Sequence, residues 1–114
     1  MRRIALIAVL TVLSATSAFA QAFEGNWGCR DTTSAKAGIL TIYGAVYGFA
    51  STTPGDASSG TGTVTGYENG VGFNDGGLKA ARNITAGRVI PDPNFGAAIQ
   101  LETSDAIVML CTPR

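Results

Sequence analysis

Glycine and proline interrupt this chain so often after residue 25 that a long helix is not expected there. Fourteen of the fifteen glycines follow position 25, as do all four prolines, and the apolar residues between them form short β-branched and aromatic clusters. No segment there keeps the i, i+3, i+4 apolar spacing of an amphipathic helix over three turns, and only Ala80-Ala81 suits one short helical turn. This pattern is typical of an all-β domain with many turns.

One hairpin is predicted around Gly44-Ala45, because glycine in the first position suits a two-residue type II′ turn. Counting outward from that turn pairs Ile42 with Tyr47. The next pair on the same face is Leu40 with Phe49, so four large apolar side chains lie together. A slip of one residue would turn the whole set outward, so the turn and the apolar face together predict the register.

A second hairpin is predicted around Asn69-Gly70, the dipeptide that best tolerates positive φ at both turn positions. Counting outward here places Phe73 across from Gly66, and an aromatic over a strand glycine is common in curved sheets. Val64 and Val71 fall on the same face as Phe73. We interpret these side chains as core and not as a platform for a ligand.

The rest of the chain contains the signals for the remaining strands. Residues 97–102 alternate in polarity, whereas 106–111 are apolar almost throughout, which predicts a central strand covered on both faces. Further strands are expected at 27–31 and 84–90, and the two prolines of 91–94 predict a rigid turn. The short connections favour a small antiparallel up-and-down barrel or curved sheet of seven to eight strands. Its expected core consists of Trp27, Leu40, Ile42, Phe49, Phe73, Ile99 and Leu101.

Residues 1–20 have the three parts of a signal peptide, which directs export. Arg2 and Arg3 are basic, residues 4–13 form an apolar run, and Ala18-Phe19-Ala20 matches the small-x-small cleavage motif. A transmembrane helix is the competing interpretation. It is disfavoured because threonines and serines end the apolar run short of the roughly 20 residues that a bilayer requires.

Cleavage after Ala20 would leave residues 21–114 as a single β domain in the periplasm or outside the cell, with Ala22 as a second possible cleavage site. No cysteine lies near either site, so neither a lipid anchor nor another stable membrane anchor is expected after cleavage. Cleavage of the leader would remove two of the eight basic residues and leave a slightly acidic domain. This charge does not favour a nucleic-acid partner.

Cys29 and Cys111 are the only cysteines, and they lie near opposite ends of the expected domain. An exported chain meets an oxidising compartment, so we expect a disulfide between them. The disulfide would close a loop of about 82 residues, which contributes on the order of 4 to 5 kcal/mol in the chain-entropy model. A reactive or metal-binding cysteine pair is the weaker alternative, because the thiols are far apart in sequence and the chain has no histidine.

The absence of histidine excludes the Ser-His-Asp triad, the Cys-His dyad and the histidine-based zinc sites. The carboxylates lie mostly at predicted turns and strand ends, and not as the facing pair that glycoside hydrolysis needs. Asn74-Asp75 and Asp92-Pro93-Asn94 offer oxygen ligands, but neither has the dense acidic pattern of a calcium loop. We therefore expect no enzymatic activity, no catalytic residue, no cofactor and no metal site.

Several short segments resemble small secreted bacterial β-barrel proteins of uncharacterised function. They are Phe-Glu-Gly-Asn-Trp-Gly-Cys at 23–29, Gly-Thr-Val-Thr at 62–65, Phe-Asn-Asp-Gly-Gly-Leu at 73–78, and the final strand ending at Cys111. The Gly25-x-Trp27 opening and the Ser-Ser-Gly-Thr-Gly of 58–62 are also weakly similar to periplasmic barrels that inhibit proteases or lysozyme. The resemblance implies the barrel fold, and for the inhibitor barrels it implies binding that blocks a hydrolase.

These observations predict a non-catalytic exported domain that works by binding a protein or a component of the cell envelope. A periplasmic inhibitor of a hydrolase, either lysozyme or a protease, is the alternative. The expected binding surface combines a polar loop, interpreted as flexible, with two tyrosines opposite the apolar faces, and it contains Tyr43, Thr53, Pro54, Gly55, Asp56, Ser58, Ser59 and Tyr67. The alternative for the loop is a long solvated connection with no partner.

Overall fold

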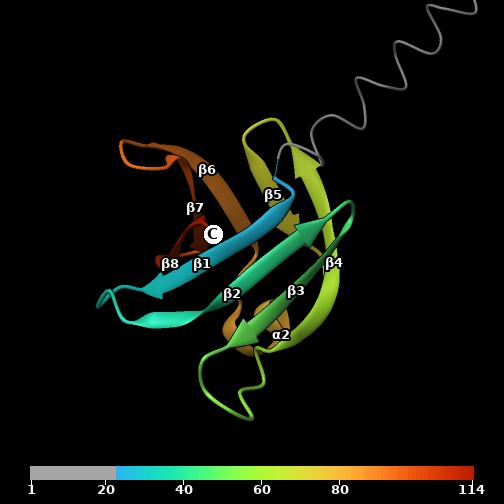
Figure 1. Ribbon diagram of the computed structural model, residues 1–114. Helices are drawn as coiled ribbons and strands as arrows, with labels where there is room; N and C mark the ends of the chain where they lie inside the picture. Colours follow the sequence, from blue (N-terminus) through green and yellow to red (C-terminus); the bar gives the residue numbers. More distant parts are fainter. Residues whose placement is uncertain (1–22) are drawn as a thin grey trace, which may run out of the picture.

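In the computed structural model, residues 23–114 form a closed antiparallel barrel in which each strand pairs with its neighbours in sequence and β8 returns to β1 (Figure 1). The elements are β1 (Gly25–Asp31), β2 (Lys36–Tyr43), β3 (Val46–Ser51), β4 (Gly60–Tyr67), β5 (Gly70–Phe73), α2 (Gly77–Arg82), β6 (Ala86–Asp92), β7 (Gly96–Glu102) and β8 (Ile107–Pro113). The expected all-β, up-and-down barrel is confirmed. The leader predicted at 1–20 and the alternative cleavage site at Ala22 lie outside the described residues.

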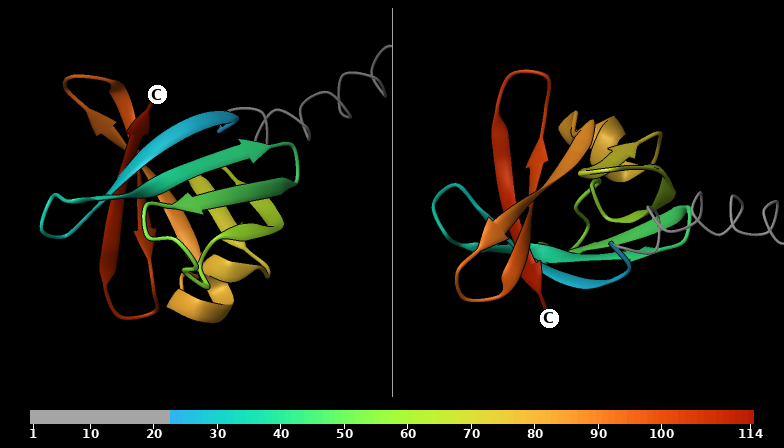
Figure 2. Two further views of the ribbon diagram at one scale, coloured as in Figure 1. Left: turned by 60° about the horizontal axis from the view of Figure 1, so that its bottom comes forward. Right: turned by 90° about the horizontal axis from the view of Figure 1, so that it is seen from above.

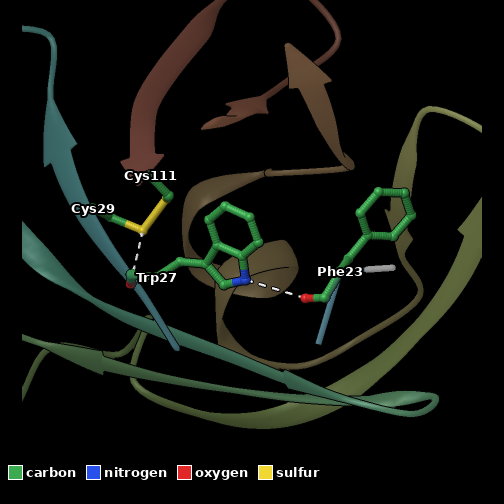
Figure 3. Close-up of a disulfide and its surroundings, with 4 residues drawn as sticks. All are labelled: Phe23, Trp27, Cys29 and Cys111. Carbon is green, nitrogen blue, oxygen red and sulfur yellow. Dashed lines mark hydrogen bonds between the residues drawn. A yellow bond between two sulfur atoms is a disulfide. The ribbon is translucent and has the colours of Figure 1, made fainter. Parts of the chain in front are cut away.

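The barrel closes where β1 and β8 pair. Cys29 lies directly opposite Cys111 in this pair, and the two are joined by a disulfide. The expected bond between the two ends of the domain is therefore present, at the seam between the first and last strands. In Figure 3 the indole of Trp27 lies between this disulfide and Phe23, whose carbonyl oxygen accepts a hydrogen bond from Trp27 Nε1 at 3.1 Å.

The barrel interior is filled by inward-pointing side chains, as the size of an eight-stranded barrel leads one to expect. All seven expected core residues are buried. Phe23 is buried beside Trp27, and at the other end of the barrel Leu78 of α2 and the nearby Ile84 are fully buried. Figure 1 shows α2 near the lower parts of β3 and β4, and this helix contains Ala80-Ala81, where one short helical turn was expected.

The β2–β3 hairpin has the predicted register. Ile42 pairs with Tyr47, and Leu40 pairs with Phe49. Gly44 has a φ of 61°, the positive value that the first position of a type II′ turn requires. The prediction succeeded because the turn residues and the apolar alternation demand the same pairing.

The predicted register of the β4–β5 hairpin is wrong by two residues. Gly66 pairs with Val71 and not with Phe73, and Tyr67 pairs with Gly70, so the turn is Glu68-Asn69. Because the shift is an even number of residues, each side chain keeps its face. Val71 and Phe73 therefore still point into the core, as predicted.

Gly70 explains why the hairpin does not turn at Asn69-Gly70. Neither residue has a positive φ, and a Cβ at Gly70 would collide with the backbone oxygen of Gly87 in β6. The glycine is needed for the close approach of β5 and β6. The aromatic over a strand glycine is also a different pair, because a Cβ at Gly72 would lie 3.0 Å from Cε2 of Tyr67.

The prediction that the last strand is covered on both faces is also wrong. Met109 and Cys111 are buried, but Ile107 and Leu110 are 50% and 39% exposed. In a closed barrel one face of each strand points inward, and the described residues provide no second layer that covers the outer face of β8. An uninterrupted apolar run thus forms a strand with one buried face.

The rigid turn expected at 91–94 begins later than predicted. β6 continues through Pro91, which pairs with Ala97 of β7. β5 pairs with β6 only as far as Arg88, so the end of β6 has a strand on one side only. Proline is tolerated at such an edge, because its missing N–H leaves no ladder bond unmade.

Tyr47 links the β2–β3 hairpin to the segment that closes the end of the barrel. Its hydroxyl donates a hydrogen bond to the carbonyl oxygen of Asp75 at 2.9 Å and accepts one from the backbone N–H of Leu78 at 3.3 Å. Burial raises the pKa of this hydroxyl above its ordinary value. The ring also packs edge-on against Phe73, with 5.0 Å between the ring centroids.

We predict that Tyr47→Phe lowers the free energy of unfolding by about 1 to 3 kcal/mol, because two backbone groups lose their partner in a buried place. Urea unfolding followed by tryptophan fluorescence measures the change. Tyr43→Phe is the matched control, since Tyr43 is 74% exposed and the loss of its hydroxyl should change stability by less than about 0.5 kcal/mol. Equal stabilities of the Tyr47→Phe variant and the wild type would contradict the proposed link.

Candidate functional site

The outward side chains of β2 from Ile39 onward, and those of β3 and β4, are uncharged. Side chains alternate along these strands, with the apolar set pointing inward and a second set pointing outward. We call this second set the neutral face, and it consists of Ile39, Thr41, Tyr43, Val46, Gly48, Ala50, Thr61, Thr63, Thr65 and Tyr67. No member carries a charge.

A shallow hollow lies on the neutral face where the three strands run side by side. Its volume is about 490 Å³, and it is lined by Thr41, Tyr43, Val46, Tyr47, Gly48, Thr61, Gly62 and Thr63. Gly48 lies in the middle strand and has no side chain to fill the space. A second hollow of about 390 Å³ shares Thr41, Gly48 and Thr61 with the first, so the depression continues along the face.

The rim of the hollow beside Tyr43 is fixed by hydrogen bonds from the segment around the start of β1. The carboxylate of Glu24 accepts a hydrogen bond from the backbone N–H of Gly44 at 2.6 Å. The hydroxyl of Thr41 donates to Oδ1 of Asn26 at 2.7 Å. These contacts hold the β2–β3 turn and position Tyr43, which directly follows Ile42 of the core.

The opposite rim is held by Asp75. Its Oδ1 accepts a hydrogen bond from the backbone N–H of Thr63 at 2.7 Å, and both carboxylate oxygens lie 3.2 Å from the Thr63 hydroxyl. Asp75 therefore anchors β4 to the segment that leads to α2. The Asn74-Asp75 segment offers oxygen ligands in the sequence, but the Asp75 carboxylate is engaged by β4.

The structure divides the predicted binding surface into two parts. Tyr43 and Tyr67 both point outward, as predicted, and belong to the neutral face. The polar loop follows Ser51, at the far end of β3 from the β2–β3 turn, and lies beside α2 (Figure 2, left). Within this loop Thr53, Pro54, Gly55 and Ser59 are exposed, Asp56 is partly exposed and Ser58 is fully buried.

The loop expected to be flexible is organised around Asp56. Its carboxylate accepts hydrogen bonds from the backbone N–H of Ser58 at 2.9 Å and from the hydroxyl of Ser51 at 2.8 Å. Arg82 of α2 forms an ion pair with it at 3.9 Å. The Ser58 N–H and then the Ser51 hydroxyl lower the pKa of Asp56 below its ordinary value, because both favour the charged form.

The binding surface predicted from the sequence includes the two tyrosines of the neutral face but not the residues at its centre. Thr41, Val46, Thr61 and Thr63 belong to strands, and their outward position could have been inferred from the alternation in the same hairpins. What the sequence could not show is that β4 lies beside β3 in a register that brings Thr63 next to Val46.

No protein-family model, curated protein or solved structure matches the chain. Among residues 23–114 no helix is long and apolar enough to cross a membrane. Within the same residues no three cysteine, aspartate or glutamate side chains gather as ligands for a metal ion.

We predict that the stability of the domain falls as the pH drops through the acid range and that Asp56 contributes to this fall. Because the pKa of Asp56 is lowered in the folded state, its contribution is complete above the ordinary value of 3.8 and is lost as the pH falls below it. Asp31 also contributes to the loss of stability at acid pH, since its pKa is lowered, chiefly by the hydroxyl of Thr33.

Urea unfolding at a series of pH values between about 6 and 3, the range in which carboxylates titrate, tests this prediction. Asp56→Asn should flatten the dependence on pH. Asp105→Asn is the control, because in residues 23–114 the Asp105 carboxylate accepts no hydrogen bond, and its pH profile should follow the wild type. An Asp56→Asn profile parallel to the wild type would show that the carboxylate does not organise the loop.

Proposed function

We propose that this chain is a non-catalytic, exported binding domain that docks onto a protein or another component of the cell envelope through the neutral face. The observation that carries the proposal is the uncharged outer surface of three adjacent strands, hollowed beside the exposed ring of Tyr43. Export enters the proposal from the signal-peptide pattern of residues 1–20.

An uncharged face is favourable for docking because little desolvation opposes its burial. Covering a charged group costs much more free energy than covering a hydroxyl or an apolar side chain. Tyr43 is 74% exposed and Val46 is 51% exposed, so both would bury much of their surface against a partner. Tyrosine is enriched in the buried centres of interfaces, where its ring supplies a large contact area and its hydroxyl a hydrogen bond.

The neutral face is also preorganised. Its residues lie on strands of a closed barrel, and the turn next to Tyr43 is fixed by Glu24 through the 2.6 Å hydrogen bond to Gly44. A rigid surface loses little conformational entropy when it binds, so more of the contact energy remains as affinity.

The roles of the acidic side chains support a function without catalysis. Asp31, Asp56, Asp75 and Asp92 each accept hydrogen bonds from nearby backbone N–H groups. Carboxylates used in this way stabilise turns and strand ends. The chain has no histidine, and both cysteines are in the disulfide, which leaves few groups that could transfer a proton or attack a substrate.

The shape of the hollow favours a macromolecular partner over a small metabolite. The hollow is open along the outer surface, whereas pockets for small ligands bury most of the ligand. The barrel interior is occupied by the core side chains. A partner that lays a surface or an extended segment across the strands would contact both hollows at once.

Tyr43→Ala tests the proposal in a capture experiment. The protein, expressed in a bacterial host with residues 1–20 in place and purified from the periplasm, is cross-linked to envelope extract, and the captured species are identified by mass spectrometry. The affinity of each purified candidate is then measured by calorimetry. We expect Tyr43→Ala to weaken binding about tenfold or more, as is typical for the loss of a central interface tyrosine.

Phe95→Ala is the matched control, because Phe95 is 55% exposed but lies on the β6–β7 turn, outside the neutral face. Binding that is unaffected by Tyr43→Ala, or weakened equally by Phe95→Ala, would refute docking through this face. Deletion of residues 53–60 tests the polar loop separately. Potent inhibition of lysozyme or of an exported protease by the wild type would favour the alternative function, an inhibitor of a hydrolase.

A further inference from the structure

Arg30 and Lys36 lie directly opposite each other on β1 and β2. Two like charges in facing positions of an antiparallel pair repel each other and lower stability. A register shift between Cys29 and Arg30 brings about this pairing, since without it Arg30 would face a different residue of β2. Bulges of this kind are common next to functional sites, where they redirect a side chain.

A third cation completes the group. Arg30, Lys36 and Arg114 all line one hollow of the outer surface, which has a volume of about 420 Å³. The backbone N–H of Arg114 donates to the carbonyl oxygen of Asn26 at 3.0 Å, and its side chain extends over Gly28, where an added Cβ would lie 3.9 Å from Arg114 Cδ. Basic residues from β1, from β2 and from beyond the end of β8 thus line one hollow.

These three cations lack the acidic partners that Arg82 and Arg88 have. Arg82 pairs with Asp56 at 3.9 Å, and Arg88 pairs with Glu102 at 3.2 Å. Within residues 23–114, Arg30, Lys36 and Arg114 form no ion pair, and no acidic side chain lines their hollow.

The nearest acidic residue in sequence points elsewhere. Asp31 follows Arg30 and therefore lies on the other side of β1, where its carboxylate accepts hydrogen bonds from Thr33 and Ala35. Arg30 is itself oriented, because its Nη1 donates to the carbonyl oxygen of Ser34 at 2.8 Å. A guanidinium has five N–H groups, so the rest of its donors remain for a ligand.

Besides the cations, the hollow has an apolar part and three hydroxyl side chains, those of Ser51, Thr52 and Thr112. The hollow is lined by Ile39 and Ala50 on one side and Pro113 on the other, with Gly28 and Gly38 between them. An inorganic anion would leave this surface uncovered. A ligand that combines an anionic group with an apolar portion would satisfy both parts of the site.

We propose that the hollow at Arg30, Lys36 and Arg114 binds an amphipathic organic anion. Its carboxylate or phosphate group contacts the three cations, and its apolar portion lies against Ile39, Ala50 and Pro113. Arginine suits this role because its planar fork of donors matches the geometry of both anionic groups. The site borders the neutral face at Ile39 and Ala50 but lies toward the Lys36 end of β2, away from Tyr43. The inference does not depend on docking through the neutral face.

The test is a titration of the purified, isotope-labelled protein with monomeric decanoate and with decyl phosphate, followed by amide chemical shifts. We expect saturable shifts at residues 28, 38, 50 and 112 and none in the β6–β7 hairpin. Octanol tests the apolar portion alone, and inorganic phosphate tests the head group alone. Both should bind at least about tenfold more weakly than decyl phosphate, since each makes only part of the contacts.

Charge variants distinguish this site from a non-specific apolar surface. Arg30→Gln combined with Lys36→Gln should weaken the binding of both anions at least about tenfold, because charge-assisted hydrogen bonds are lost. Arg88→Gln, which removes a cation on β6, should bind like the wild type. The absence of shifts with both anions, or equal binding of octanol, would overturn the proposal.

A stability measurement separates a ligand site from a structural role of the same residues. Lys36→Gln should raise the melting temperature of the ligand-free protein, because the substitution removes the repulsion by Arg30. Added decanoate should raise the melting temperature more in the wild type than in this variant. A lower melting temperature of ligand-free Lys36→Gln would contradict the proposal. Vesicles of neutral phospholipid with and without phosphatidylglycerol then show whether the anion is taken from a membrane or from solution.

Discussion

The pairing of β1 with β8 is the contact on which the rest of the structure depends. It closes the sheet, so each strand has one neighbour on each side and one face directed into the interior. The Cys29–Cys111 disulfide fixes this pair across 82 residues of sequence, and the chain-entropy model assigns such a cross-link on the order of 4 to 5 kcal/mol. That contribution is comparable to the net stability of a small domain.

Closure determines where binding can take place. The interior is filled by the core side chains, with Phe23 at one end and Leu78 at the other, so the outward positions of the strands are left to interact with other molecules. Two outer regions differ sharply in charge. The neutral face extends from Ile39 of β2 to β4, whereas Arg30, Lys36 and Arg114 line a cationic hollow next to the seam, which borders the neutral face at Ile39 and Ala50. Both regions are rigid because the strands that hold them belong to one closed sheet.

The sequence predicts the fold well where local and long-range requirements agree. At the β2–β3 hairpin, Gly44 and the alternation of apolar residues demand one register, and the structure has it. At Asn69-Gly70 the local turn preference does not determine the turn, because Gly70 is needed where β5 approaches Gly87 of β6 closely. The candidate binding sites are likewise predictable only where local sequence patterns determine them. Tyr43 is recognisable as outward from its own hairpin, but the pairing of Arg30 with Lys36 depends on a bulge that no local pattern reveals.

The closed barrel is tested most directly by nuclear Overhauser effects between backbone protons of facing strands in the purified, unreduced protein. The structure predicts cross-strand contacts between Cys29 and Cys111 at the seam and between Gly66 and Val71 in the β4–β5 hairpin. It also predicts that no thiol reacts with a labelling reagent after denaturation without reductant. The absence of contacts between β1 and β8, together with two reactive thiols, would contradict closure of the barrel.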